Sequence, residues 1–310
     1  MLLKNFMKNK HILKVSIAIP AYNEGFNIQN VLKDVFNQKQ TDWVLKEVLV
    51  YSDGSSDDTV KMVKQVKSFK VKIINGTRRK GKTYRINQML RDFSGEILVM
   101  FDADIKINDN RVIEKLINEF RKNNSVMLVG GNSLPLTPKT FFQKAVYTTF
   151  QVFYESRKFF RDGHNVFGCT GSCIAIRRKF AKELVLPKIV NEDVYIYLAC
   201  KASGYSFRYV DSAKVFYKLP LYIKDYIKQV LRSEPKAVHF DLTNHFTDIR
   251  HVELDRPLLP YIKSILKVFI KNPLGVILMI IINLFCIPFF SIVFKKYSLN
   301  WFTASSTKNI

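Results

Sequence analysis

The chain has 310 residues, of which 47% are hydrophobic and 24% are charged. These proportions exclude an intrinsically disordered protein, and the length is sufficient to bury a sizeable core. Its 49 Lys and Arg residues against 26 Asp and Glu residues give a formal net charge of +23, which suits an anionic partner such as a nucleotide, a nucleic acid or an acidic membrane surface.

Residues 1–13 form a basic N-terminal tail in which lysines interrupt the apolar residues. Because the tail has no uninterrupted apolar run, it does not predict a signal peptide. The four cysteines lack the paired spacing of a zinc site, so we expect reduced thiols in a reducing compartment. Both features predict that the domain after the tail is cytoplasmic.

From residue 14 onward, short β-rich runs alternate with amphipathic helical stretches. In chain order these segments are 15–19, 27–37, 47–51, 57–67, 71–74, 96–101, 110–122 and 126–130. Continuous apolar strands joined by helices predict an α/β fold whose mostly parallel sheet is flanked by helices. After about Lys139 a long helical stretch precedes two further strand candidates, 173–177 and 207–210, which indicates an acceptor half after a nucleotide half.

Polar motifs follow the first two predicted strands. IPAYNEG (19–25) forms a strand-end turn in which Tyr22 is placed to stack on a base and Glu24 to meet a ribose hydroxyl. YSDGSSDDT (51–59) puts Asp53 at the end of the next strand, where we expect its carboxylate to be available to a ligand. Taken singly, each residue of the first turn is as compatible with a structural role as with a functional one.

A second interpretation comes from GTRRKGKT, residues 76–83, which satisfies the phosphate-loop pattern between a predicted strand and a predicted helix. It allows a phosphate-loop NTPase. Against this reading, the loop would lie in the middle of the sheet and leave the motifs at 19–59 without a role. In addition, Arg78, Arg79 and Lys80 crowd the phosphate cradle. We therefore keep the NTPase as a weaker alternative.

The strand EILVMF ends in an Asp-x-Asp triplet. A spacing of two puts the carboxylates of Asp102 and Asp104 on one side, with Ala103 pointing away. Such hard oxygen ligands suit Mg²⁺ or Mn²⁺ bridging a diphosphate, so both aspartates are candidate metal ligands.

Taken in order, these motifs resemble family 2 glycosyltransferases, inverting enzymes with a GT-A fold, over roughly residues 14–235. The resemblance implies a GT-A catalytic domain at 14–240 and a nucleotide-sugar donor, most often a UDP-sugar. It also implies the donor-binding residues, which are Pro20, Ala21, Tyr22, Glu24, Asp53, Lys82, Asp102 and Asp104.

The same resemblance implies an acceptor site. Gly171 and Ser172 would line it, and Asp193 would be the general base beside Glu192. A sugar hydroxyl is a poor nucleophile unless a carboxylate takes its proton, whereas an acceptor phosphate needs no base. The acids therefore favour a hydroxyl acceptor on a glycan or lipid-linked glycan over polyprenyl phosphate. The alternative is that both acids only stabilise a helix N-terminus.

Processive synthases of this family carry a Gln-x-x-Arg-Trp element, and this chain keeps Gln229 and Arg232 but has Ser233 in place of the tryptophan. The missing ring favours the addition of one or a few sugars, in polysaccharide biosynthesis of the cell envelope. A catalytically inactive nucleotide-sugar-binding subunit stays an alternative, and so does a partner membrane subunit. We expect no nucleic-acid partner, because no recognisable nucleic-acid-binding module is present.

The last part of the chain predicts membrane lipids as a partner. After a linker at 241–256, the segment 257–297 combines an interfacial helix, with lysines four residues apart, and an uncharged stretch at 274–294 that is long enough for a transmembrane helix. Pro273 marks a break between the two, and 298–310 is a tail. We expect the protein at the cell membrane with its catalytic domain in the cytoplasm.

Overall fold

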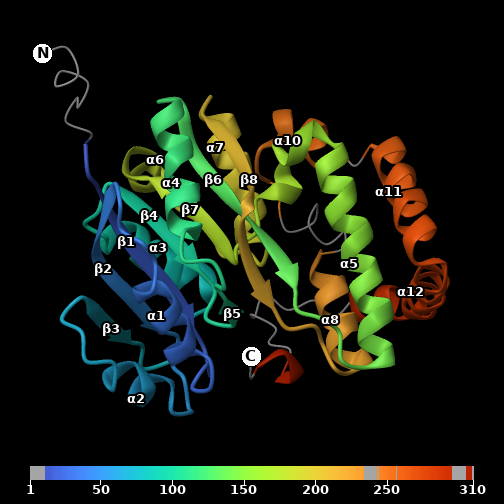
Figure 1. Cartoon of the computed structure of the whole chain (residues 1–310), viewed down its shortest axis with the longest axis horizontal. Coiled ribbons are helices and arrows are strands. Elements are labelled where there is room, and N and C mark those ends of the chain that lie inside the picture. Colours follow the sequence, from blue (N-terminus) through green and yellow to red (C-terminus); the bar gives the residue numbers. More distant parts are fainter. Residues whose placement is uncertain (1–10, 234–241, 243, 256, 295–304, 309–310) are drawn as a thin grey trace, which may run out of the picture.

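The computed structural model describes residues 11–233, 242, 244–255, 257–294 and 305–308, and for 231–233, 286–294 and 305 it describes the backbone alone. The described residues form an eight-stranded sheet in the order β3-β2-β1-β4-β7-β6-β8-β5 (Figure 1). The strands are β1 (Leu13–Ala21), β2 (Trp43–Ser52), β3 (Val71–Asn75), β4 (Ile97–Phe101), β5 (Ile105–Lys106), β6 (Val126–Pro135), β7 (Cys173–Arg177) and β8 (Ser206–Tyr217).

Strands β1 to β4 pair in parallel, as the sequence predicts. Strand β7 then runs antiparallel between β4 and β6, while β8 is parallel to β6 and carries the short antiparallel β5. All the predicted strands are present. The antiparallel directions of β7, beside β4 and β6, and of β5, beside β8, were not predicted. Periodicity along one strand carries no information about the direction of its neighbour.

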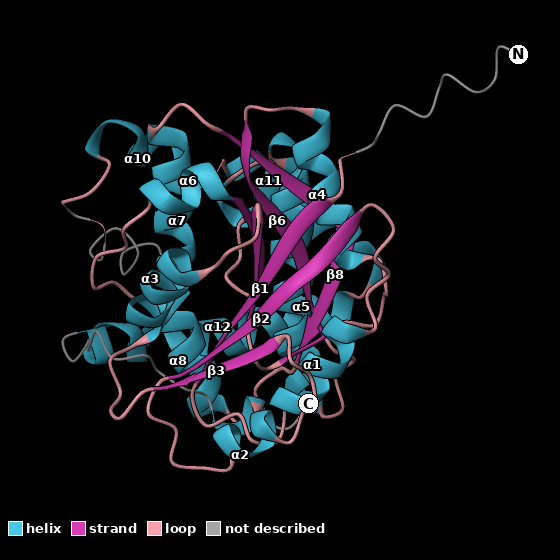
Figure 2. Ribbon diagram, turned by 90° about the vertical axis from the view of Figure 1, so that its left-hand side faces the viewer, coloured by secondary structure: helices cyan, strands magenta, loops and turns pink. Residues whose placement is uncertain are grey.

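Helices cover both faces of the sheet (Figure 2). The α-helices are α1 (Ile28–Phe36), α2 (Thr59–Lys64), α3 (Lys82–Asp92), α4 (Val112–Lys122), α5 (Phe141–Phe159), α6 (Arg178–Glu183), α7 (Glu192–Ala202), α8 (Ile223–Ser233), α10 (Thr247–Leu254), α11 (Leu258–Lys271) and α12 (Pro273–Phe294). The predicted helical stretches at 27–37, 57–67 and 110–122 correspond to α1, α2 and α4.

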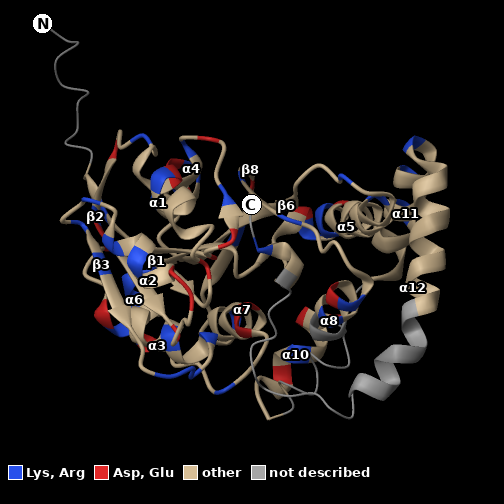
Figure 3. Ribbon diagram, turned by 90° about the horizontal axis from the view of Figure 1, so that it is seen from below, with Lys and Arg blue, Asp and Glu red and all other residues tan. Residues whose placement is uncertain are grey.

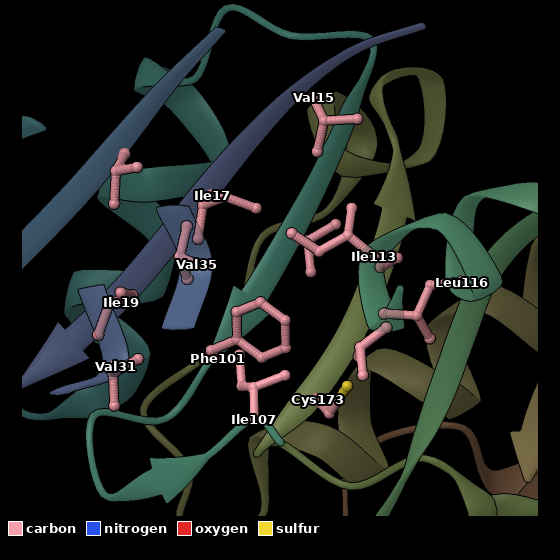
Figure 4. Packing of buried hydrophobic residues seen from close by; sticks show 14 of the residues in the cluster. Val15, Ile17, Ile19, Val31, Val35, Phe101, Ile107, Ile113, Leu116 and Cys173 are labelled. Carbon is pink, nitrogen blue, oxygen red and sulfur yellow. The ribbon is translucent and has the colours of Figure 1, made fainter. Parts of the chain in front are cut away.

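One face of the sheet packs against α1 and α4. Figure 4 shows Ile17 and Ile19 of β1 directed toward Val31 and Val35 of α1, with Phe101 of β4 nearby. In α1 the buried residues recur every three or four positions, which is the spacing of one helical face. Burying each such side chain stabilises the fold by roughly 1.5–3 kcal/mol.

The opposite face of the sheet packs against α3, α6 and α7. Leu98 and Met100 of β4 belong to this second core, together with Met89 of α3 and Ile196 of α7. Because side chains alternate along a strand, the next position of the same phase, Asp102, comes out on the side of α3 and α7. The phase of β4 therefore decides which helices the first metal-ligand candidate meets.

Helices α5, α8, α11 and α12 form a group beyond the β6 and β8 side of the sheet (Figure 1). Val152 of α5, Val268 of α11 and Met279 of α12 share a small buried core. Asn283 of α12 also hydrogen-bonds to the Tyr226 hydroxyl on α8. One side of both α11 and α12 is therefore packed on the protein.

Helix α12 begins at Pro273, where the break was predicted, and coincides with the predicted transmembrane stretch at 274–294. Within the part of the chain that the structure describes, no helix combines the length and the apolar character needed to cross a membrane, so the transmembrane prediction is not supported.

Candidate active site

A cavity of about 390 Å³ opens where β1 and β4 end and extends to α5, α7 and α8. The predicted site residues that line it are Pro20, Glu24, Lys82, Asp102, Asp104, Gly171, Ser172, Glu192, Asp193 and Gln229. The fold thus gathers motifs spread over two hundred positions of sequence into one cavity. Among the described side chains, those of Ala21, Tyr22 and Asp53 are not part of its wall, and the side chain of Arg232 lies outside the described residues.

Lys82 links Asp102, which follows β4, to Glu192, which begins α7. Its Nζ atom lies 2.7 Å from Oδ1 of Asp102 and 2.6 Å from Oε1 of Glu192. Burial alone would lower the pKa of Lys82, but the charges of Asp102 and Glu192 raise it above its usual value, so the side chain is a permanent cation. Lys82 begins α3 directly after Gly81, whose φ of 97° belongs to the region that favours glycine.

Asp102 and Asp104 follow β4, and both line the cavity. Loss of hydration raises the pKa of Asp104, and the negative charges of Asp102 and Glu24 raise it further. A divalent cation would relieve this repulsion between carboxylates. The described residues contain no group of three or more His, Cys, Asp or Glu placed to hold a metal. Two carboxylates nevertheless fit Mg²⁺ or Mn²⁺, because these ions take their remaining ligands from water and substrate phosphates.

Asp193 lies at the first turn of α7, and backbone amides hold its carboxylate. Its Oδ2 atom accepts a hydrogen bond of 3.1 Å from the Gly171 amide, and Oδ1 accepts one of 2.9 Å from the Val194 amide. Together the two bonds hold the carboxylate in one orientation at the start of α7. Asp193 is therefore oriented at the cavity wall, as a general base requires.

Gly171 is closely surrounded. A Cβ atom at this position would lie 3.1 Å from Oε1 of Glu192 and 3.2 Å from Nζ of Lys82. Glycine therefore allows the backbone to approach the ion pair while its amide binds Asp193. The neighbouring Ser172 hydroxyl lies 2.5 Å from that of Ser133, which links this loop to β6.

The expectation that the Asp53 carboxylate is available to a ligand is wrong, because groups of the protein donate hydrogen bonds to it. It is fully buried, and it accepts hydrogen bonds from the amides of Lys80 and Gly81 and from Nε of Arg85 at 2.8–2.9 Å. The loop amides that a phosphate loop would turn toward a nucleotide are thus turned toward a carboxylate. This geometry argues for a structural Asp53 and against the NTPase interpretation of residues 76–83.

Two side chains of the turn after β1, those of Tyr22 and Glu24, also contact other groups of the protein. The guanidinium of Arg79 lies 4.2 Å from the ring centroid of Tyr22, on the surface where base stacking was predicted. Glu24 lines the cavity, and its Oε2 atom accepts a hydrogen bond of 2.9 Å from Asn27.

The cavity wall formed by α5 was not predicted from the sequence. Helix α5 contributes Phe150, Phe153, Tyr154 and Arg157 to the cavity, at positions that share one helical face. Their spacing could have identified the face, but which element it packs on depends on the fold. Thr307 and Lys308, from the predicted tail, also line the cavity, and nothing in their local sequence indicates it.

The model of glycosyl transferase family 2 matches residues 16–185 of the chain. The described strand-end turns, the Asp-x-Asp triplet and the Gly171 loop all lie within this range.

Known proteins similar to the chain include the dolichol-phosphate mannosyltransferase of Pyrococcus furiosus, 34% identical over 119 residues, which are 38% of this chain and 33% of the relative. The poly-beta-1,6-N-acetyl-D-glucosamine synthase of Staphylococcus epidermidis is 28% identical over 129 residues, 41% of this chain and 30% of that protein. The chain thus spans about a third of the length of these relatives.

Among solved structures, a mannosyltransferase from Pyrobaculum calidifontis, in complex with GDP-mannose and Mn²⁺, has a TM-score of 0.58 at 17% identity. The match covers 93% of this chain and 77% of the other. At this identity the likeness shows a common fold, which is the predicted GT-A-like arrangement.

Proposed function

Because the chain belongs to glycosyl transferase family 2, we propose that it transfers a sugar from a nucleotide-sugar, most simply a UDP-sugar, to an acceptor hydroxyl with inversion at the anomeric carbon. The acceptor in this proposal is a glycan or a lipid-linked glycan at the cytoplasmic face of the cell membrane.

The observation that carries the proposal is that one cavity holds both the donor-side carboxylates and an oriented base. Lys82 lies within 2.7 Å of both Asp102 and Glu192, and Asp193 follows Glu192 at the start of α7. The donor diphosphate would lie beside Asp102, Asp104 and Lys82. An acceptor entering from the side of α5 and α8 would then meet Asp193.

In the proposed reaction, the Asp193 carboxylate accepts the proton of the acceptor hydroxyl as its oxygen bonds to the anomeric carbon. The bond from this carbon to the phosphate oxygen breaks, and the nucleoside diphosphate leaves with its electron pair. Lys82 offsets negative charge on the leaving diphosphate. A divalent cation held by Asp102 and Asp104 would supply further positive charge at the same place.

The test is nucleotide release across UDP-, GDP- and dTDP-sugars with Mn²⁺ or Mg²⁺, using the wild type, Asp104→Asn and Asp193→Asn. Release from one donor that falls by about 100-fold or more in both variants is expected. Phosphate release from ATP instead would overturn the proposal in favour of an NTPase. Nucleotide binding without transfer to any acceptor would indicate an inactive binding subunit.

A second candidate acceptor is polyprenyl phosphate. The aromatic side chains of Phe150, Phe153 and Phe167 give the acceptor side of the cavity an apolar wall, and one similar protein is a dolichol-phosphate mannosyltransferase. The two acceptors differ in their need for a base. Asp193→Asn should abolish transfer to a hydroxyl and leave transfer to polyprenyl phosphate largely intact, so the same variant distinguishes them.

The membrane part of the proposal is association with an anionic bilayer surface through α11 and α12. Leu266 and Ile270 on α11 and Leu274 and Leu284 on α12 are more than half exposed. The described part of α12 carries no charge (Figure 3), and the exposed Lys263 and Lys271 lie on α11 beside these apolar residues. Apolar residues together with lysines suit a surface with anionic headgroups.

Sedimentation with vesicles, with and without phosphatidylglycerol, tests this part. Leu266→Asp with Ile270→Asp should weaken binding about tenfold or more, whereas Val185→Asp, an exposed apolar residue on another surface, should not change it. Equal binding of all three proteins would contradict the assignment of this face.

A further inference from the structure

Residues 306–308, called the strap here, cross the cavity although they come after α12 in the chain. At one end, the amide and hydroxyl of Ser306 donate hydrogen bonds of 3.1 and 2.6 Å to Oδ2 of Asp225 on α8. The Ser306 hydroxyl also accepts one of 3.2 Å from the Leu221 amide. Figure 1 shows the short helix that contains Ser306, in red, beside α8.

The strap is a packed part of the fold. Ser306 and Thr307 are 8% and 7% exposed, and Asp225 is fully buried. The two hydrogen bonds from Ser306 to the buried Asp225 carboxylate, and the one that Ser306 accepts from the Leu221 amide, fix where the strap leaves α8. Lys308 is thereby directed across the cavity toward the turn after β1.

At its other end, Lys308 is bound entirely by that turn. Its Nζ atom lies 2.6 Å from Oε1 of Glu24 and donates hydrogen bonds to the carbonyl oxygens of Asn23, at 2.8 Å, and Tyr22. An ammonium group has three protons, and these three acceptors account for all of them. Lys308 therefore has no proton left for a phosphate unless it gives up one of these bonds.

The same contacts affect what Glu24 can bind. Its Oε2 atom accepts from Asn27 and its Oε1 atom accepts from Lys308, so both oxygens bind the protein. Glu24 lies in the turn where the proposed function puts the nucleoside. Because Glu24 is only 8% exposed, a ribose hydroxyl that bonds to its Oε1 atom would have to compete with Lys308 for the space beside this oxygen.

We propose, resting on the proposed function, that Lys308 is a donor-site residue that sets the affinity for the nucleoside diphosphate by holding Glu24 until the nucleotide displaces it. The fraction of molecules with Glu24 released limits the apparent affinity, because the nucleotide binds that form. Ser306 and Asp225 act as positioning residues, since they deliver Lys308 to the turn.

The experiment is calorimetric titration of UDP and of GDP, each with Mn²⁺, into the full chain and its variants. Lys308→Gln should bind one nucleotide about tenfold more tightly than the wild type. Ser306→Ala, which loosens the anchor, should change affinity in the same direction by a smaller factor. Lys179→Gln removes an exposed lysine on α6 and should leave affinity unchanged. In transfer assays the gain should appear as a lower KM for the donor with kcat little changed.

Weaker nucleotide binding by Lys308→Gln would overturn the proposal and make Lys308 a direct contact of the donor. Equal binding by Lys308→Gln and the wild type would also overturn it, while leaving the proposed function intact. If neither the wild type nor any variant binds a nucleotide, the proposed function itself fails, and the role of Lys308 fails with it.

Discussion

The Nζ atom of Lys82, at the start of α3, lies 2.6 Å from Oε1 of Glu192, at the start of α7. These residues come from opposite halves of the chain, and Asp102 shares the same ammonium group. One cation thus balances a carboxylate that follows β4 and another at the start of α7. A change in any of the three alters the charge on both sides of the cavity.

Lys82→Met should reduce kcat/KM for the donor on the order of 100-fold, because the diphosphate loses its cation and two carboxylates are left facing each other. Lys80→Met is a matched control two residues away, since Lys80 points to the exposed Tyr84 ring. Steady-state kinetics on both variants checks this expectation. Equal losses in the two variants would mean that charge on the loop, rather than the ion pair, matters.

Gly171→Ala should lower kcat by about 10- to 100-fold with little change in the unfolding temperature. The added methyl group would lie within 3.2 Å of both the Lys82 ammonium and the Glu192 carboxylate, so the pair has to shift. A misplacement of about 1 Å at a reacting centre can cost roughly 100-fold in rate. Kinetics and a thermal melt of the same sample measure both quantities. Full activity would show that the ion pair tolerates movement.

Asp53→Asn should destabilise the fold by roughly 3–5 kcal/mol, because it leaves the buried guanidinium of Arg85 without its counter-charge. Urea unfolding measures the loss. In a double-mutant cycle with Arg85→Met, the two effects should sum to more than the loss in the double variant. An Asp53→Asn protein of normal stability with a much higher donor KM would instead restore Asp53 to the nucleoside site.

Glu47 makes stability depend on pH. It is buried on β2, where burial opposes its ionisation, but hydrogen bonds from Lys72, Ser94 and Ser16 outweigh this and lower its pKa to about 2. Its stabilisation is complete above the unfolded-state pKa near 4.5 and is lost as the pH falls from there toward 2.

Glu47→Gln should therefore be less stable than the wild type by roughly 2–3 kcal/mol at pH 7, with a difference that shrinks below pH 4.5. Urea unfolding at a series of pH values checks it. Glu183→Gln, at an exposed glutamate, should show no such dependence. If the difference in the free energy of unfolding between Glu47→Gln and the wild type is constant with pH, Glu47 acts through packing rather than through its charge.

Much of the fold could be predicted because its information is local. Continuous apolar runs predict β1 to β4, and the three- to four-residue spacing in 27–37 predicts α1. The antiparallel β7 and the two-residue β5 were beyond reach, because strand direction depends on which partner is available across the sheet. The transmembrane reading of 274–294 rested on composition alone, while α12 packs on α5 and α8.

The candidate site likewise contains residues that the sequence indicated and residues whose role depends on tertiary contacts. Asp102 follows from its place after β4, at the edge to which parallel strands bring their side chains, whereas Lys82 and Asp193 were indicated by the family resemblance. Asp53 has the same kind of position, yet Arg85 and the loop amides take up its carboxylate. Which of two equivalent strand-end acids remains open to a ligand depends on partners that are distant in the sequence.

By itself, the sequence determined the α/β class, the strand-end positions of the polar motifs and the spacing that puts Asp102 and Asp104 on one side, because these follow from the period of a strand or a helix. The tertiary structure alone decided that Asp53 is internally paired, that α5 forms the far wall and that Lys308 reaches Glu24. Those contacts join segments whose separation along the chain has no local signal, and packing and charge pairing bring them together after the elements have formed.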